Sequence, residues 1–423
     1  MNYEVIVIGG GPAGAYSAAL LSKYGYNVLL IEAGSYKRYK VCSGGTPLRS
    51  VELLSKLGDP SKIVEREIKG VNIFIENKEV ISTYKEKPIG YSYYRSELDQ
   101  WIRDRASDLG SVVYHETIAK KIKIERDFVY VKCYQKGLAI DFKGKLLIGA
   151  FGIKPDLLLQ LGIKPTEYLI SVQSEFKGDT QHMEEEIRSS FNFLIHPEFS
   201  TFSYGWIFPK SEGLSIGITD RMEGNIVLER FKKMLSQHPL VKEKIKNMKI
   251  MPVNGKDVLA HLNPNRPLKR TFGRRFVLVG DAAGFADPIT WEGIYFALKS
   301  GEIAANAFSK LLEKGNINDN STSLYEKMWK RDFGKVFEIE WAVKQLLWGK
   351  DLTNKWLTIA KFFKSKEERY NLLKEELALS MSIAPVIKKM STIEKLNIGF
   401  KLKGYKLLRK PINFVYVFKT LFS

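Results

Sequence analysis

The sequence predicts an α/β protein in which a parallel sheet is interrupted by an inserted antiparallel sheet and followed by a helical C-terminal region. Three observations favour this class: an apolar strand at residues 3–8 that runs directly into glycines, short apolar runs separated by turns over about 167–251, and a basic, helical pattern after about residue 320. Buried parallel strands are near-continuous apolar runs, whereas short strands separated by turns are typical of antiparallel sheets. A chain of 423 residues exceeds what one hydrophobic core usually serves, so several structural regions are expected.

The first elements predict a βαβ unit. Residues 3–8 form a buried strand, residues 12–24 a helix rich in Ala and Leu, and residues 27–31 a second apolar strand. Gly25 is placed to end the helix. This order of elements is the unit that binds nucleotides in Rossmann-type folds.

A glycine motif lies between the first strand and the helix. In Gly9-x-Gly11-x-x-Gly14, the first glycine permits a tight turn, the second lets the backbone approach a pyrophosphate, and the third lets the helix pack on the strand. The helix N-terminus then offers N–H groups and partial positive charge to the phosphates. Glu32 follows the second strand, where a carboxylate accepts hydrogen bonds from a ribose hydroxyl. The unit therefore predicts a dinucleotide with an unphosphorylated ribose, FAD or NAD rather than NADP.

The elements that follow extend this region. Residues 71–84 alternate like an antiparallel pair of strands, and residues 95–109 form an amphipathic helix. Strands are expected near 111–114 and 128–134, and residues 145–149 return to the texture of a parallel strand.

A second nucleotide-binding signal lies far along the chain. Residues 275–279 again have the texture of a parallel strand, GDAAG follows at 280–284, and a helix is expected over about 293–312. The carboxylate of Asp281, next to Gly280, is placed to hold a ribityl hydroxyl of FAD, while the helix N-terminus faces flavin or phosphate oxygens. We therefore predict a discontinuous Rossmann-type FAD-binding domain, an antiparallel-sheet substrate domain and a basic helical region, at residues 1–70, 95–160 and 265–315, residues 71–94 and 161–264, and residues 316–423, respectively.

The pairing of GxGxxG near residue 10 with GDAAG near residue 280 resembles the flavoproteins built like para-hydroxybenzoate hydroxylase. Within that group the chain resembles the geranylgeranyl reductase family, over roughly the first three quarters of its length. The motifs that carry the resemblance are VCSGG at 41–45, YRSELDQW at 94–101, YGWIFPK at 204–210 and GDAAGFADPITWEGIYFALKSG at 280–301.

The resemblance implies an FAD-dependent reductase that saturates C=C bonds of geranylgeranyl chains in the synthesis of archaeal-type membrane lipids. It implies FAD contacts, beside the glycines of the two motifs, from Ala13, Glu32, Cys42, Ser43, Gly44, Gly45, Arg95, Ala119, Asp281, Gly293 and Ile294. Tyr204, Trp206 and Phe208 alternate along one strand and so share a face. They form either an aromatic wall for a long apolar substrate, with Pro209 shaping its end, or simply the core of the sheet region.

Three positions depart from the family pattern. Trp291 stands where glycine is usual in the loop that faces the flavin, Phe151 where aspartate is usual, and Thr219 at the second glycine of a GxG after YGWIFP. Phe151 argues against an NADPH-dependent hydroxylase. An indole at 291 lies either in the substrate cavity or against the sheet region, and we expect the cavity. Cys42 and Trp291 are the flavin-facing candidates for catalysis, with the proton donor unassigned.

Charge and composition bear on the partners and the compartment. Lys and Arg number 66 against 47 Asp and Glu, a formal net charge of +19, and such an excess attracts polyanions. The segment 395–423 mixes basic and aromatic residues, and it either caps the core as a solvated helix or grips an anionic membrane surface. Nothing beyond charge supports binding to nucleic acid. Two cysteines without a CxxC pair and no expected signal peptide favour a cytoplasmic protein, peripheral at the inner face of the membrane.

Some alternatives stay open at this level. The five histidines show no metal-binding spacing, so no metal site is expected. A flavin monooxygenase of the same fold, or a membrane-associated flavoprotein that passes electrons to a quinone, are rival functions. The electron donor is left open between ferredoxin and NAD(P)H.

Overall fold

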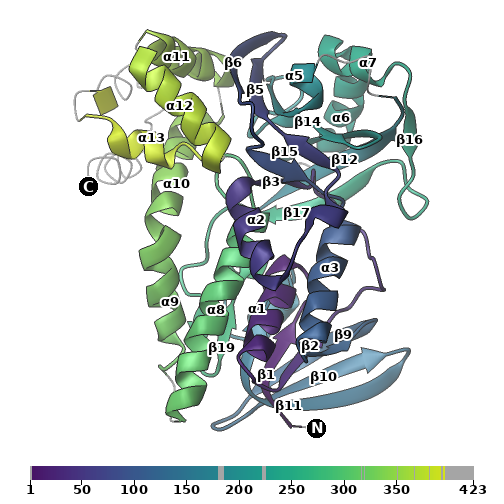
Figure 1. The fold of residues 1–423 in the computed structure, drawn as a ribbon, viewed down its shortest axis with the longest axis vertical. Coiled ribbons are helices and arrows are strands. Elements are labelled where there is room, and N and C mark those ends of the chain that lie inside the picture. The colour runs from purple at the N-terminus through teal and green to yellow at the C-terminus, as the bar shows by residue number, and fades with distance from the viewer. Residues whose placement is uncertain are drawn as a thin grey trace.

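The computed structural model describes residues 2–395 apart from 180–184, 222–224, 316, 319, 350, 366, 381 and 392–393. The predicted membrane-binding segment 395–423 therefore lies outside the described residues beyond Lys395. Within the described part, two eight-stranded sheets lie one above the other in Figure 1, and C-terminal helices flank the upper sheet.

The first sheet contains the predicted parallel core. Its central strand β1 pairs in parallel with β2 on one side and with β11 on the other, so that Val5 lies opposite both Val28 and Leu146. The sheet order is β18-β19-β11-β1-β2-β8, with the hairpin β9-β10 attached to β11. Its strands are β1 (Asn2–Ile8), β2 (Val28–Ile31), β8 (Val112–Tyr114), β9 (Thr117–Ile124), β10 (Val129–Gln135), β11 (Leu138–Gly149), β18 (Phe272–Gly273) and β19 (Phe276–Leu278).

Three helices pack beside this sheet: α1 (Pro12–Lys23), α3 (Arg95–Asp108) and α8 (Ile294–Lys314). The contact between α1 and α8 is close, because a Cβ at Gly301 would lie 2.5 Å from the carbonyl oxygen of Ala13. The small residues of α1 permit this approach, and its residues Pro12 to Ser22 are all buried. The expected helix near residue 293 is confirmed, but GDAA itself forms a separate 3-10 turn, Gly280–Ala283.

The second sheet has the order β16-β12-β15-β14-β13-β5-β6, with β17 also paired to β12. As expected, the described pairings of this sheet are antiparallel, with one exception: β13 pairs with β5 in parallel, Phe191 opposite Val71. Local alternation of apolar and polar residues predicts a strand but not the direction of a partner more than a hundred residues away. Its strands are β5 (Gly70–Ile75), β6 (Lys78–Tyr84), β12 (Tyr168–Lys177), β13 (Ser190–Ile195), β14 (Gly205–Lys210), β15 (Gly213–Arg221), β16 (Lys249–Met251) and β17 (Leu259–Pro264).

A small third sheet was not predicted. It consists of β3 (Gly45–Pro47), β7 (Gly90–Ser92) and β4 (Arg66–Ile68), and it draws strands from both of the predicted first two domains. The domain boundaries stay a prediction. The shorter helices of these regions are α2 (Leu48–Leu54), α4 (Pro155–Gln160), α5 (Glu185–Arg188), α6 (Ile226–Gln237) and α7 (Pro239–Ile245).

The described residues between 323 and 395 are mostly helical, as predicted for this region. A rod of helix runs along one side of the molecule and leads to a cluster of helices beside β5 and β6. The rod packs on α8 through aromatic rings, among them Phe296 and Phe337, whose centroids lie 4.7 Å apart. The helices are α9 (Ser323–Trp329), a π-helical turn (Lys330–Gly334), α10 (Lys335–Leu347), α11 (Leu352–Lys364), α12 (Glu367–Ser380) and α13 (Ala384–Lys389).

Candidate cofactor and active site

A cavity of about 640 Å³ lies between the two large sheets. Residues at or just beyond the carboxyl ends of β1, β2, β11 and β19 line it, namely Ile8, Ile31, Ala150 and Val279. This edge of a parallel sheet is where ligands bind in open α/β folds. The volume falls within the range of small-molecule and cofactor sites.

The glycine motif has the geometry that its sequence predicts. Gly9 has φ +106°, and a Cβ there would lie 2.2 Å from the carbonyl oxygen of Ala150. At Gly14 a Cβ would lie 1.9 Å from the carbonyl oxygen of Gly9. At Gly11, in contrast, a Cβ would approach only the guanidinium of Arg38, at 3.7 Å. The backbone at Gly11 is therefore open to the cavity, and a pyrophosphate fits against the N-terminus of α1.

Glu32 is fixed at the edge of this cavity. Its Oε2 accepts the N–H of Gly10 at 2.8 Å, and its Oε1 accepts the N–H of Gly34 at 2.7 Å and Nε of Arg38 at 2.8 Å. Burial opposes its ionisation, but the charge and hydrogen bonds of Arg38, with Gly34, outweigh burial and lower the pKa of Glu32. An ionised, oriented carboxylate at this place suits a ribose hydroxyl.

The sequence did not predict Arg38. Nη2 of Arg38 lies 3.4 Å from Oδ2 of Asp99. The Asp99 carboxylate also accepts hydrogen bonds from Nε and Nη2 of Arg95, at 2.7 and 2.9 Å. Arg38 therefore joins Glu32 to the buried Arg95–Asp99 pair. The pairing could not be read from spacing alone, because Asp99 and Arg38 come from different elements.

Asp281 lines the same cavity and meets two residues that the sequence did not single out. Lys40 Nζ lies 2.8 Å from its Oδ2, and His261 Nε2 lies 4.0 Å from it. Burial raises the pKa of Asp281, but Lys40 and His261 hold it well below its usual range. Burial and the charge of Lys40 lower the pKa of His261 to about 4, so His261 is neutral near pH 7. Asp281 is therefore an ionised acceptor, as its predicted contact with a ribityl hydroxyl requires.

A buried lysine holds the loop that carries Cys42. Lys210, at the end of β14, donates to the carbonyl oxygens of Ser43 at 2.6 Å and Tyr93 at 2.8 Å. Gly44 has φ +74°, and a Cβ there would lie 1.9 Å from the carbonyl oxygen of Tyr93. The loop is thus fixed in a conformation that presents Cys42, Ser43 and Gly45 to the cavity.

Tyr204, Trp206 and Phe208 all line the cavity, and they also belong to the buried core beside the second sheet. Both alternatives that the sequence left for these rings therefore remain open. Gly217, opposite Trp206 on β15, leaves space for the indole, because a Cβ there would lie 2.2 Å from Cζ2 of the ring. Thr219 occupies the second glycine position. Its hydroxyl forms a hydrogen bond with the hydroxyl of Ser171 at 2.6 Å, so its side chain is directed to the neighbouring strand β12.

Most other predicted site residues also line the cavity, including Ala13, Arg95, Ala119, Gly280, Gly293 and Ile294. Gly14, Gly44 and Pro209 do not line it. The first two shape the backbone behind the cavity, and Pro209 lies in β14 beyond the lining residue Phe208.

Trp291 adopts a left-handed backbone conformation with φ +56°, which explains why glycine suits this position. Its Nε1 donates to the hydroxyl of Ser203 at 2.6 Å, and Lys344 Nζ lies 3.8 Å from the ring centroid. The ring lines the cavity and is also held by a residue of the sheet region. The indole therefore lies partly in the cavity and partly against the sheet region, so each of the two predicted alternatives is met in part.

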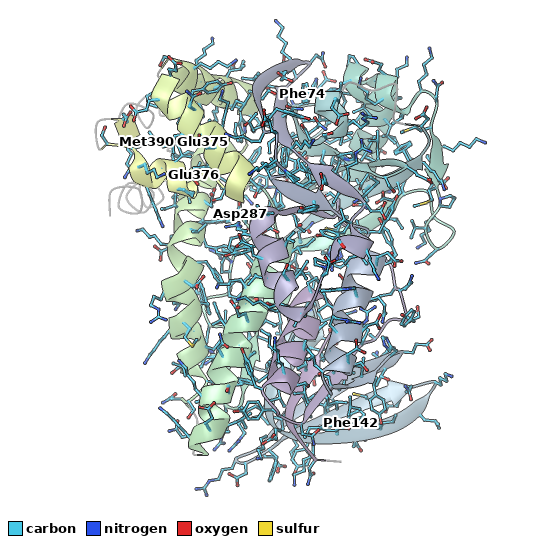
Figure 2. All side chains as sticks on the ribbon, in the orientation of Figure 1. Phe74, Phe142, Asp287, Glu375, Glu376 and Met390 are labelled. Carbon is cyan, nitrogen blue, oxygen red and sulfur yellow. The ribbon has the colours of Figure 1, made fainter. Side chains whose placement is uncertain are left out.

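A second, almost wholly apolar cavity of about 90 Å³ lies between the second sheet and the C-terminal helices. Val71, Ile81 and Phe193 line it from the sheet, while Val343 of α10 and Met390, which directly follows α13, line it from the C-terminal region. Figure 2 shows Met390 among these helices.

Tyr204 and Thr290 line both cavities, and the phenol of Tyr204 donates a hydrogen bond to the carbonyl oxygen of Thr290. This pair therefore lies at the boundary between the polar cavity and the apolar one. The sequence did not predict the second cavity, because its walls come from segments some 300 residues apart.

Among the described residues, no group of three or more His, Cys, Asp and Glu side chains is placed to hold a metal ion. Within the same residues, every helix is too short or too polar to cross a bilayer.

Fold and site together define a Rossmann-type flavoprotein, an FAD-dependent oxidoreductase. The chain belongs to the FAD binding domain family, whose model matches residues 2–313. The predictions of the fold class and of FAD as cofactor are thereby confirmed.

Relatives with established names confirm the resemblance to the geranylgeranyl reductases. A digeranylgeranylglycerophospholipid reductase of Methanocaldococcus jannaschii is 27% identical over 335 residues, which are 78% of this chain and 82% of the relative. A second such reductase, of Methanopyrus kandleri, is 25% identical over 93% of this chain and 98% of its own length. The chloroplastic geranylgeranyl diphosphate reductase of Arabidopsis thaliana is 28% identical over 79% of this chain and 72% of its own.

Solved structures share the fold. A geranylgeranyl bacteriochlorophyll reductase-like protein of Thermoplasma acidophilum superposes with a TM-score of 0.76 at 20% identity, covering 96% of this chain and 99% of its own. A flavin-dependent brominase superposes with a TM-score of 0.75 at 18% identity, with the same coverage. Similarities at this level of identity describe the fold and do not separate a reductase from a halogenase.

Proposed function

We propose that this protein is an FAD-dependent reductase that saturates C=C bonds of geranylgeranyl or similar isoprenoid chains in membrane lipid synthesis. The observation that carries the proposal is the pair of adjoining cavities. The larger holds charged groups suited to a dinucleotide, and the smaller is an apolar chamber beside it. A flexible hydrocarbon chain that reacts at the flavin needs such a chamber for the part that does not react.

In this proposal the residues of the larger cavity bind FAD. When bound and reduced, FAD supplies the hydride. Glu32 and Asp281 would accept hydrogen bonds from its hydroxyl groups, and the N-terminus of α1 would hold its pyrophosphate. The loop that Lys210 holds presents Cys42 to the same cavity. The proposed contacts are Gly9, Gly11, Ala13, Glu32, Cys42, Ser43, Gly45, Arg95, Ala119, Gly280, Asp281, Gly293 and Ile294, all of which line the cavity. Gly14 and Gly44 support these contacts from behind the cavity, through the close backbone approach that each permits.

The protein's task is then to orient the alkene and to exclude water. An isolated alkene is a poor hydride acceptor, so the double bond must be held against the cofactor in a dry site. Tyr204, Trp206 and Phe208 supply a rigid aromatic wall for this purpose, and Pro209 stiffens the strand next to it. Trp291, which is held to Ser203 beside Tyr204, also lines the cavity and in this proposal limits which part of the chain reaches the flavin.

The test is a single-turnover reaction. Dithionite-reduced protein is mixed with a geranylgeranyl lipid without oxygen, and the products are analysed by mass spectrometry. We expect a gain of about two hydrogens per reduced double bond, with flavin reoxidation. A reduced flavin that stays reduced with the lipid, yet consumes oxygen with an aromatic substrate or halide, would favour a monooxygenase or halogenase. Electron transfer to a quinone without change in the lipid would favour a membrane-associated electron-transfer flavoprotein.

Two partners belong to the same proposal. The electron donor is ferredoxin or NAD(P)H, and anaerobic bleaching of the bound flavin by each in turn distinguishes them.

The net charge of +19 supports a peripheral position at an anionic membrane surface, with the basic segment 395–423 as its contact. Deletion of residues 395–423 should then weaken binding to anionic vesicles more at low salt than at high salt. Unchanged vesicle binding after this deletion would contradict the contact.

A further inference from the structure

Saturation of a C=C bond requires a proton in addition to a hydride, and the flavin-facing residues predicted from the sequence include no evident proton donor. The donor must reach the larger cavity, carry a transferable proton near neutral pH and be shielded from water. Glu292, which follows Trp291 in the loop before α8, meets each of these conditions.

The position of Glu292 places a carboxyl group at the cavity. The residue lines the cavity and is only 4% exposed. Its Oε1 accepts the N–H of Tyr295, in the first turn of α8, at 2.7 Å. Its Oε2 is buried without a hydrogen-bond partner. A buried carboxyl oxygen in this state is commonly explained by a functional role or by an absent ligand.

The surroundings of Glu292 favour the protonated acid. Burial raises its pKa, the charge of Arg49 on α2 and the N–H of Tyr295 lower it, and Asp287 raises it again. Arg49 also stacks on the ring of Tyr295, 3.8 Å from the centroid. The balance raises the pKa of Glu292 to about 7, which is near the value at which a general acid is most effective in neutral solution.

Other candidates are less suited. The hydroxyl of Tyr204 donates to Thr290, and burial raises the pKa of Tyr204 well above its usual value. Asp287 does not line either cavity, and its Oδ1 accepts the N–H groups of Ile289 and Thr290 at 2.9 Å each. His261 is neutral and lies beside Asp281.

We propose that Glu292 is the general acid of the reduction and protonates one carbon of the double bond. The O–H bond of Glu292 breaks, and its proton forms a C–H bond with the π electron pair of the alkene. The hydride that reduced FAD supplies forms the second C–H bond, at the other carbon. Glu292 is left as a carboxylate and regains a proton from solvent when product leaves. The proposal rests on the proposed function.

The experiment compares wild type with Glu292→Gln and a matched control. An amide at 292 retains a carbonyl oxygen for Tyr295 but cannot deliver an acidic proton. The control is Glu340→Gln, since Glu340 is a fully buried acid that interacts with Asp287 but lines neither cavity. Each protein is reduced with dithionite and mixed with a geranylgeranyl lipid, and flavin reoxidation is followed from pH 5 to 9.

We expect Glu292→Gln to slow reoxidation by the lipid at least about 100-fold, as for loss of a general acid. Glu340→Gln should stay within about 3-fold of wild type, since the general acid is retained. The wild-type rate should fall as pH rises through about 7, because only protonated Glu292 donates, and the variant should lack this step. FAD affinity and reduction by dithionite should be unchanged.

A second readout does not depend on activity. In an infrared titration of the apoprotein, one protonated carboxyl should lose its proton near pH 7 in wild type. This titrating signal should be missing from Glu292→Gln, whereas the signals of other buried acids with a raised pKa, such as Asp287 and Glu340, should remain. If the glutamine variant does not fold, Glu292→Asp decides: retained activity with a shifted pH profile supports the acid, and an unshifted profile overturns it. Full reduction by Glu292→Gln overturns the role of Glu292 alone, whereas a wild-type protein that reduces no alkene overturns the proposed function as well.

Discussion

Filling the apolar cavity should block long isoprenoid substrates without affecting FAD. Val343 on α10 is 5% exposed and lines only the apolar cavity of about 90 Å³, so a phenyl ring at this position projects into space that the chain of the substrate would occupy. We therefore predict that Val343→Phe excludes about one isoprene unit from the cavity.

The magnitude follows from the area lost. Each buried methylene contributes about 0.8 kcal/mol, so five carbons contribute about 4 kcal/mol. At about 1.4 kcal/mol per tenfold change, KM for a geranylgeranyl lipid should rise by up to about 1000-fold. Because the chamber accepts the ring, the stability cost should stay at or below the usual 1–3 kcal/mol, roughly, of an overpacked core.

The assay compares two substrates and two variants. A geranyl substrate, two isoprene units shorter than geranylgeranyl, should retain its KM with Val343→Phe, and FAD binding should be unchanged. Val336→Phe is the control, because Val336 lies two turns earlier on α10 and lines neither cavity. An equal loss for both substrates, or an equal loss in the control, would refute the assignment of this cavity to the substrate chain.

Three further predictions concern single positions. Glu32→Ala should weaken FAD binding about 10-fold or more in a fluorescence titration, since charged hydrogen bonds contribute about 1.5–3 kcal/mol. Because the pKa of Glu32 is lowered in the folded protein, the carboxylate stays ionised below its usual pKa, and the wild-type advantage should be lost only as pH falls through the lowered pKa. Gly217→Ala should displace the indole of Trp206 and lower the free energy of unfolding by about 1–3 kcal/mol in urea, whereas Gly334→Ala, with only ordinary contacts at 3.5 Å, should not. Trp291→Gly removes a strained residue and an indole from the cavity, so it should broaden the range of chain lengths or bond positions reduced, and an unaltered product pattern would contradict its proposed role.

Local sequence was sufficient for the nucleotide-binding unit. The strand, glycine turn, helix and second strand are adjacent in the chain. Gly9 and Gly14 permit close backbone approaches, to Ala150 and to Gly9 respectively, and Gly11 leaves the backbone open to the cavity. Glu32 follows the second strand, so its place at the same edge of the sheet was fixed by the alternation of elements. The aromatic wall was equally accessible, because side chains two residues apart on a strand share a face.

The sequence alone therefore determined the class of fold and the cofactor, and it identified many, though fewer than half, of the residues that line the larger cavity. Only the tertiary structure decided the pairing of Glu32 with Arg38 and of Asp281 with Lys40, 241 residues apart, and it alone revealed the parallel pairing of β13 with β5. The apolar cavity and the burial of Glu292 likewise depend on segments brought together by folding. The physical reason is that periodicity and motif spacing record contacts within an element or between neighbouring elements, whereas burial, pKa and cavities depend on everything that packs around a residue.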